Sequence, residues 1–410
     1  MGKARQFDAT KANHSGHLYL VLNIPTHMTN TANQFILNFN LKKWGSLIIL
    51  ALAVAIVVID GTVLNVSISS IVRDLNTDLK NIQWAITSYS LVLAALTIFG
   101  GKLGDIFGRK RMFITGALIF GIGSLVTALS PNVNILVLGW SLIEAIGAAL
   151  MIPASSALIV SNYEGKDRGL AFGIYGVTAG IGAAAGPILG GFLTSTFSWR
   201  WVFGINLFVV LALVLGSRIV KNYAVPSKKV NLDYFGVVLS SLGLASLTYG
   251  IIESSTYGWI ESKKAFEFAG NFSNLGGLSI SFYTILLGLI LIAGFVFWEI
   301  YLENVKKLEP LISMKIFLNR QFSFGIGVIT ILFAGFTGIL TFGVVLFYQY
   351  VFNLSALESG IGLIPLSLGS FIIAPLSAKI AEKISAKITV QIGLVIAIIG
   401  CIVLFNSRCY

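Results

Sequence analysis

Long apolar runs alternate with short polar joints along most of this 410-residue chain. A bilayer core about 30 Å thick is crossed by roughly 20 helical residues, because each residue advances about 1.5 Å along the helix axis. Eleven runs approach that length with few charges, and they lie near residues 47–71, 82–99, 112–129, 135–160, 170–194, 201–215, 235–252, 278–298, 322–350, 357–376 and 388–404. None alternates like a barrel strand, so the pattern predicts an all-α polytopic membrane protein with about eleven transmembrane helices.

Composition and charge support the membrane assignment and exclude other classes of protein. The chain is 56% hydrophobic and 11% charged, with a mean hydropathy of +0.87, whereas about a quarter of the residues in a soluble domain are charged. If the N-terminus is cytoplasmic, the inner stretches hold 22 of the 28 Lys and Arg residues and the outer stretches hold 6. This bias predicts a cytoplasmic N-terminus. Because the bases are spread over alternate loops, the net charge of +11 predicts no nucleic-acid partner.

Residues that usually carry enzymatic, metal or redox chemistry are scarce. Cys401 and Cys409 form neither a disulfide framework nor a CxxC pair, and all three histidines fall in the polar tail of residues 1–43. The sequence contains no Walker loop and no set of residues typical of a Ser-His-Asp triad within a span. We therefore predict no enzyme activity, no catalytic residue, no metal site and no cofactor.

Five formal charges interrupt the apolar pattern between the second and third runs, in the stretch GKLGDIFGRKR at 101–111. Gly101 and Gly108 let the backbone turn and helices approach closely, and Asp105 can pair with Arg109. A basic anchor that fixes membrane topology would explain the bases. It would not explain the acid among them or the spacing of the glycines.

This stretch resembles the signature loop of the major facilitator superfamily of secondary transporters. In that family the loop is a latch, which holds the two halves of the transporter closed on the cytoplasmic side and releases them during alternating access. The resemblance implies that Asp105 and Arg109 form the latch pair and that Gly101 and Gly108 shape it. It also implies a fold of two similar bundles, and AKIAEKISAK at 378–387 aligns with the loop without gaps as a weaker copy.

A glycine-rich pattern marks the fifth run, which reads GIYGVTAGIGAAAGPILGG. Glycines at every fourth residue give one helix face a smooth groove for a neighbouring helix, and the proline permits a bend. Packing alone would explain such spacing. The full pattern, however, resembles the antiporter signature of drug-exporting members of the superfamily, and here it consists of Gly173, Gly182, Gly186, Pro187, Gly190 and Gly191.

Further segments resemble the fourteen-span drug:proton antiporter branch, among them DGTVLNVSISSI in the first run and SWRWVFGIN before the sixth. The resemblance implies a cytoplasmic N-terminal tail over 1–43, a six-helix bundle over 44–221, two extra central spans with their loops over 222–318, and a partial C-terminal bundle of three spans over 319–410. A fourteen-span member has three more helices after the eleventh run. We therefore expect this chain to be truncated at its C-terminal end.

Two acidic residues lie deep in predicted spans, where an ionised carboxylate is costly and normally faces a cavity or a partner. Asp60 lies near the centre of the first span beside a polar stripe of Gly61, Asn65 and Ser69 at four-residue spacing, and we expect it to carry protons. Glu144, in the fourth span, is either a second carrier of charge that attracts a cationic substrate or a helix–helix hydrogen bond.

Family members usually carry an arginine three residues before Glu144, whereas this chain has Ser141 and no Lys or Arg deep in any span. This departure favours direct exchange at the carboxylates over an arginine-assisted relay. Aromatic residues such as Tyr89 could line a pocket for flat hydrophobic cations, but for any single one packing or lipid contact is the favoured explanation.

The resemblance implies secondary active export of lipophilic or cationic small molecules, such as drugs, across the cytoplasmic membrane in exchange for protons. The expected partners are protons, a small hydrophobic or cationic substrate and the lipid bilayer. Two alternatives stay open. One is an inactive truncated transporter fragment, and the other is an uptake carrier for a small solute, which the glycine pattern of the fifth run disfavours.

Overall fold

The computed structural model of this chain describes residues 41–221, 232–268, 271–273 and 277–333, single positions between 335 and 380, and residues 384–406. The residues that form the candidate site all lie in the compact unit Gly45–Tyr410.

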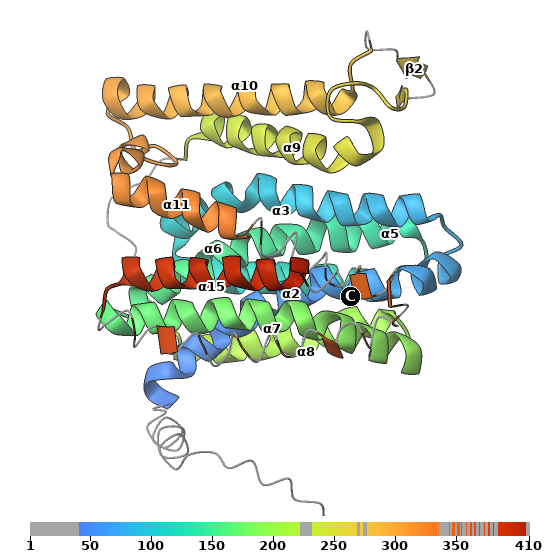
Figure 1. Cartoon of the computed structure of the whole chain (residues 1–410), viewed down its shortest axis with the longest axis horizontal. Coiled ribbons are helices and arrows are strands. Elements are labelled where there is room, and N and C mark those ends of the chain that lie inside the picture. The colour runs from blue at the N-terminus through green and yellow to red at the C-terminus, as the bar shows by residue number, and fades with distance from the viewer. Residues whose placement is uncertain are drawn as a thin grey trace, which may run out of the picture. The chain divides into compact units, whose positions relative to one another are not determined.

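Eight helical segments among the described residues are long and apolar enough to cross a membrane. They are formed by α2 (Leu41–Asp74), α3 (Leu79–Phe107), α4 (Arg109–Ala128), the continuous α5 (Val133–Leu136), η1 (Val137–Glu144) and α6 (Ala145–Asn162), α7 (Gly165–Thr196), α8 (Arg200–Gly216), α9 (Tyr234–Tyr257) and α10 (Ile280–Tyr301). They coincide with the first eight predicted runs (Figure 1). The prediction of a helical, multi-pass membrane protein is therefore confirmed.

The last three predicted spans are only partly described. The helix α11 (Arg320–Phe333) follows the short η4 (Met314–Leu318) and covers the start of the ninth run, and α15 (Ala386–Asn406) coincides with the eleventh. Most of the tenth run lies outside the described residues. The total of eleven spans and the division of the chain into domains stay predictions.

The described residues depart from an all-α structure at one place. The strands β1 (Phe266–Phe268) and β2 (Asn271–Ser273) pair antiparallel in the loop between α9 and α10. A short hairpin is possible there because it lies between two spans, where exposed backbone groups do not have to be satisfied within lipid. Hydropathy predicts the loop but carries no signal for this hairpin.

Helix ends form where single residues satisfy or redirect the backbone. Asn132 Oδ1 accepts a hydrogen bond of 3.1 Å from the amide of Ile135 at the start of α5, and Ser279 Oγ accepts one of 3.1 Å from Ser281 at the start of α10. Gly108 separates α3 from α4 with a φ of 101°, which is open to glycine and strained for other residues. The signature loop, residues 101–111, is therefore a direct helix-to-helix corner.

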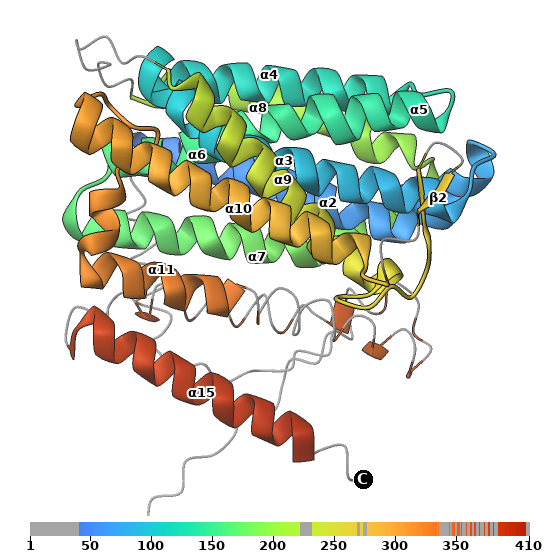
Figure 2. The same cartoon turned by 90° about the horizontal axis from the view of Figure 1, so that it is seen from above.

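Glycines bring helices of the first half into backbone contact. A Cβ added at Gly116 on α4 would lie 2.7 Å from the carbonyl oxygen of Gly147 on α6. At Gly100 on α3, an added Cβ would overlap the carbonyl of Ala149, also on α6. Such contacts are typical of membrane helices, which associate through close packing of small residues. On its other side α4 runs along α8 (Figure 2).

The glycine-rich face of α7 packs against α2. An added Cβ would lie 3.2 Å from the α2 backbone at Gly182 and 3.0 Å from it at Gly190, and at Gly186 it would overlap the hydroxyl of Thr62. Asp60 lies within this stretch of α2. The helix that carries the acid is therefore held in place by small residues of α7.

Polar contacts join the ends of α2, α4 and α8 that lie opposite the signature loop. Asp74, beyond the apolar part of α2, forms an ion pair with Arg200 and accepts a hydrogen bond of 3.0 Å from Trp199 Nε1. Arg200 also donates to the carbonyl of Ser130, just after α4, at 2.9 Å. The hydrogen bonds from Arg200 and then Trp199 lower the pKa of Asp74, so its charged form is favoured.

The helices α9 and α10 form a pair beside α3, with α9 in the middle (Figure 1). A Cβ added at Gly288 on α10 would lie 2.6 Å from the amide nitrogen of Leu247 on α9, and one at Gly243 would lie 2.9 Å from the side chain of Ile292. The pair is thus packed as closely as the helices of the first half.

Replacing Gly186 by Leu should force α7 away from α2. Overpacking at a tight contact usually costs about 1–3 kcal/mol, so we expect a lower free energy of unfolding in lipid nanodiscs. Gly180→Leu is the matched control, because an added Cβ at Gly180 of the same helix meets nothing within 4 Å. Equal stability of the two variants would contradict the close-contact interpretation.

Candidate functional site

Two carboxylic acids are buried side by side in the first half of the protein. Asp60 comes from the middle of α2 and Glu144 from the last position of η1, and their exposed fractions are 1% and 0%. Both accept a hydrogen bond from Nδ2 of Asn206 on α8, at 3.1 Å to Asp60 Oδ1 and 3.2 Å to Glu144 Oε1. The two acids predicted from the sequence therefore meet at a single amide.

Each acid has a second neutral donor. Trp140 Nε1 donates to Asp60 Oδ2 at 2.6 Å, and Ser124 Oγ on α4 donates to Glu144 Oε1 at 2.7 Å. Asn206 Nδ2 also lies 3.1 Å from Ser124 Oγ. Glu144 Oε2 is buried and accepts no hydrogen bond within the described part of the chain. We call Asp60, Glu144, Asn206, Trp140 and Ser124 the acid network.

The local sequence explains how the fourth span delivers two of these side chains. Residues 137–144 form a π-helix, a rare widened turn that often occurs at functional sites. Gly123 on α4 allows the approach, since an added Cβ there would lie 2.7 Å from the Cβ of Glu144. Glu144 therefore reaches Ser124, the next residue of α4.

Neutral groups also occupy the rest of this neighbourhood. The Tyr89 ring stacks on Trp140 with 4.9 Å between ring centres and 13° between planes, and its buried hydroxyl has no hydrogen-bond partner among the described residues. Ser141, at the position where an arginine is usual in the resembled family, donates to the carbonyl of Ala85 on α3 at 2.8 Å. The side chains that donate hydrogen bonds to the two acids, those of Asn206, Trp140 and Ser124, are uncharged.

Sequence reasoning identified both acids but missed Asn206, Trp140 and Ser124. Asn206 carried a signal, because it is the single amide in the apolar span RWVFGINLFVVLALVLG, and a polar residue inside a membrane helix is a candidate for function. Trp140 and Ser124 had no comparable signal. The predicted stripe beside Asp60 is not tested, since the side chains of Asn65 and Ser69 lie outside the described residues.

The signature loop lies against α6. Arg109 contacts Asp105 Oδ1 at 3.3 Å through Nη2, and through Nη1 it donates to the Ser161 hydroxyl at 3.0 Å and the Ala157 carbonyl at 3.3 Å. The Asp105–Arg109 pair is 54% and 42% exposed, so the ion pair itself adds little stability. Its role as a latch stays a prediction.

Other residues of the signature loop bind more distant segments. Lys102 Nζ donates to the carbonyl of Pro310, after α10, at 2.7 Å, and Lys110 Nζ donates to the carbonyl of Val220, after α8, at 2.9 Å. A Cβ added at Gly101 would meet only Pro153, at the ordinary distance of 3.7 Å. The tight helix contact is instead at the preceding residue, Gly100. The weaker copy of the loop is largely outside the described residues.

The residues of the glycine pattern in α7 differ in their surroundings. Gly182, Gly186 and Gly190 face α2 on both sides of the level of Asp60, whereas an added Cβ at Gly173 would meet nothing within 4 Å. Pro187 lies inside the continuous helix, and Gly191 follows the contact face. The pattern therefore supports the helix that carries the acid, but it does not itself line the acid network.

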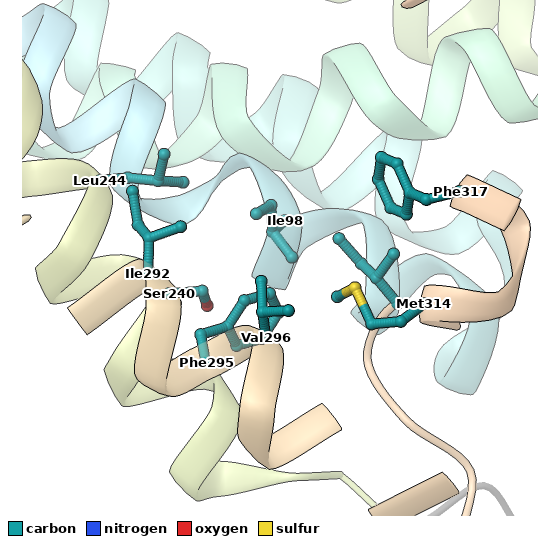
Figure 3. A pocket seen from close by; sticks show the side chains of 9 residues that line it. Ile98, Ser240, Leu244, Ile292, Phe295, Val296, Met314 and Phe317 are labelled. Atoms are coloured by element: carbon teal, nitrogen blue, oxygen red, sulfur yellow. The ribbon is translucent and has the colours of Figure 1, made fainter. Parts of the chain in front are cut away.

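A separate hollow of about 190 Å³ lies between α3, α9, α10 and η4 (Figure 3). We call it the apolar groove. Its lining is apolar apart from Ser240, and it includes Ile98, Leu244, Ile292, Phe295, Val296, Ile312, Met314 and Phe317. None of these residues belongs to the acid network.

Comparison with known proteins gives a family match over most of the chain. Residues 50–407 match the family model described as Major Facilitator Superfamily. The puromycin resistance protein pur8 of Streptomyces alboniger is 31% identical over 342 residues, which are 82% of this chain and 62% of the relative. The tetracenomycin C resistance and export protein of Streptomyces glaucescens is 31% identical, over 82% of this chain and 58% of the relative.

Two further matches agree with these. A multidrug resistance protein B homolog of Mycobacterium tuberculosis is 28% identical over 83% of this chain and 59% of the relative. The chain thus spans about three fifths of the length of the curated relatives it matches. Among solved structures, the proton:xylose symporter XylE has a TM-score of 0.50 at 14% identity, over 83% of this chain and 69% of that chain, which supports the fold alone.

Replacing Asn206 by Leu should expose the dependence of both acids on one amide. Buried acceptors that lose a donor usually cost about 1–3 kcal/mol, so we expect a lower free energy of unfolding. Combined with Asp60→Asn, the change should be non-additive, by on the order of 0.5–3 kcal/mol, since the two side chains are in direct contact. Ser141→Ala, which removes a nearby hydrogen bond outside the acid network, should be additive with Asp60→Asn. Additive behaviour of Asn206→Leu would contradict the shared-amide arrangement.

Proposed function

Because the chain belongs to the Major Facilitator Superfamily, a family of transporters and not of enzymes, we propose that it exports lipophilic or cationic small molecules in exchange for protons. The observation that carries the proposal is the pair of buried acids joined by Asn206 without a basic partner in hydrogen-bond contact. Relatives named for resistance to puromycin and for resistance to and export of tetracenomycin C support the substrate class.

The charge of the acid pair explains how exchange would work. Two ionised carboxylates that share one amide in a membrane-embedded site would repel each other and lack a counter-ion. One proton on the pair relieves this repulsion, and a substrate cation beside the pair would relieve it equally well. Since one positive charge is enough, the proton and the cation compete for the same site, and this competition makes the two movements opposite in direction.

The neutral members of the acid network have positioning roles in this mechanism. Asn206 Nδ2 holds both carboxyl groups on one amide, so the charge of one acid is felt by the other. Trp140 fixes the second oxygen of Asp60 and stacks on Tyr89. With a serine at position 141, no fixed arginine charge is present to keep Asp60 ionised when the proton leaves.

The two sequence motifs take supporting roles in the proposal. Asp105 and Arg109 would act as the latch of alternating access, with Gly108 forming the corner that places them. Gly182, Gly186 and Gly190 of α7 would keep α2 in register, so that Asp60 stays opposite Trp140 and Asn206 while the bundles move.

Asp60→Asn removes the titratable group but keeps a side chain of the same shape. In proteoliposomes with an imposed pH gradient and ethidium as the test cation, we expect proton-driven efflux to fall by at least about tenfold. Asp78→Asn is the control, because it makes the same chemical change at an exposed residue. Asp78 lies at the start of α3, and its side chain forms no capping hydrogen bond there. Efflux by Asp60→Asn at the rate of the unaltered protein would remove Asp60 from the mechanism. Accumulation of ethidium inside, against the expected direction, would favour an uptake carrier.

A further inference from the structure

A second pair of carboxylic acids meets at the end of the α9–α10 pair that lies near the signature loop. Asp233 is the residue before α9, and Glu299 is in the last turn of α10, where its exposed fraction is 0%. Asp233 Oδ2 accepts a hydrogen bond of 2.8 Å from Trp298 Nε1, and Glu299 Oε2 accepts one of 2.8 Å from the amide of Leu311. Neither acid belongs to the acid network.

One oxygen of Glu299 is left over in this arrangement. Oε1 is buried and has no hydrogen-bond partner in the described part of the chain. A Cβ added at Gly236 would lie 2.7 Å from this Oε1 atom, and it would overlap Oδ2 of Asp233. The missing side chain at Gly236 therefore lets the free oxygen of Glu299 approach the carboxyl group of Asp233.

A proton on Glu299 would give its unpaired oxygen, Oε1, a hydrogen-bonding role. Protonated at Oε1, Glu299 becomes a hydrogen-bond donor, and the Asp233 carboxyl group, next to the same vacant position at Gly236, offers acceptor oxygens on that side. Without the proton, two like charges would face each other, and the backbone amides of Leu311 and Ile312 would be the hydrogen-bond donors to Glu299. We propose that Asp233 and Glu299 form a proton-binding site, and that its proton holds this end of the α9–α10 pair against the signature loop. The proposal does not depend on transport.

The surrounding charges fit a pair that carries one negative charge and not two. Lys102 on α3, whose ammonium donates to the carbonyl of Pro310, acts electrostatically on Glu299, and its single positive charge offsets one negative charge of the pair. Lys306 lies with its ammonium 5.4 Å from the ring centre of Trp298, the residue whose Nε1 donates to Asp233. Glu303, one helical turn after Glu299, forms an ion pair with Lys315, with 3.2 Å between Oε1 and Nζ.

On the side of the acid pair that lies deeper in the helix pair, the neighbouring residues line the apolar groove and offer few hydrogen-bond donors. Phe295 lies one turn before Glu299 on α10, and Ser240 lies one turn after Gly236 on α9, so the groove begins one helical turn deeper (Figure 3). The Ser240 hydroxyl donates to the carbonyl of Val237 in its own helix. The lining therefore supplies no donor that would stabilise a second negative charge.

The bound proton would act on the signature loop through two adjacent residues. Leu311 donates to Glu299, and the carbonyl of the preceding Pro310 accepts the hydrogen bond from Lys102. Release of the proton to the cytoplasmic side leaves a second negative charge on the pair. Repulsion then pushes Asp233 away from Glu299, and the strain reaches the 310–311 segment, because Leu311 stays bound to Glu299 while Pro310 is bound to Lys102 on α3.

The test compares the purified protein in lipid nanodiscs with Glu299→Gln at about pH 6 and about pH 9. Spin labels at positions 111 and 308, both exposed and outside the proposed site, report the distance between the signature loop and the segment after α10. We expect a narrow distance distribution at low pH that broadens at high pH. In Glu299→Gln the distance distribution should stay narrow at both pH values. The glutamine amide keeps an acceptor for Leu311 and supplies a donor to Asp233 that does not depend on pH.

Two further variants keep the test decisive. Glu303→Gln, in the next turn of the same helical segment, should behave like the unaltered protein. If Glu299→Gln does not fold, Asp233→Asn removes the second carboxyl group, keeps an acceptor for Trp298 and should likewise abolish the pH response. An identical pH response in the unaltered protein and in the folded variant would overturn the proposal, whatever the outcome of transport assays.

Discussion

The hydrogen bonds from Asn206 to Asp60 and Glu144 are the interaction on which the rest of the first half depends. Two acids buried in a membrane-embedded bundle are tolerated only when donors surround them and their charge is controlled. Four helical segments supply these groups: α2, α4, η1 and α8. Glycines such as Gly123 and Gly186 matter because they let these backbones come close enough for short polar side chains to meet.

The acids lie between two sets of contacts that fix the helix ends. At one end, Asp74 joins α2 to α8 through Arg200 and Trp199. At the other, the signature loop reaches α6 through Arg109 and the segment after α10 through Lys102. Both acid pairs repeat one arrangement, in which an indole N–H holds an aspartate and a glutamate keeps one free oxygen. We propose the same ligand, a proton, for both pairs.

Hydropathy alone predicted the first eight spans, because a stretch of about 20 apolar residues has few other uses. Asp60 and Glu144 were also predictable from the sequence, because an ionisable residue within an apolar span is costly and therefore rare. Their partners were not, since which helices meet depends on crossing angles and small-residue contacts that no local pattern records. The contact at Gly100 and not Gly101 is a case in point. Glu299 escaped notice because it lies at the end of a span, where an acid normally reaches water.

The central claim is that Asp60 and Glu144 share a proton that a substrate cation displaces. Difference infrared spectroscopy on the purified protein in nanodiscs tests it most directly, by following the C=O stretching band of protonated carboxyl groups while ethidium is added at constant pH. We expect the band to weaken on binding, with release of a proton to the buffer, and Asp60→Asn to abolish this change. A band that stays constant while ethidium binds would show that the cation does not displace a proton from these acids.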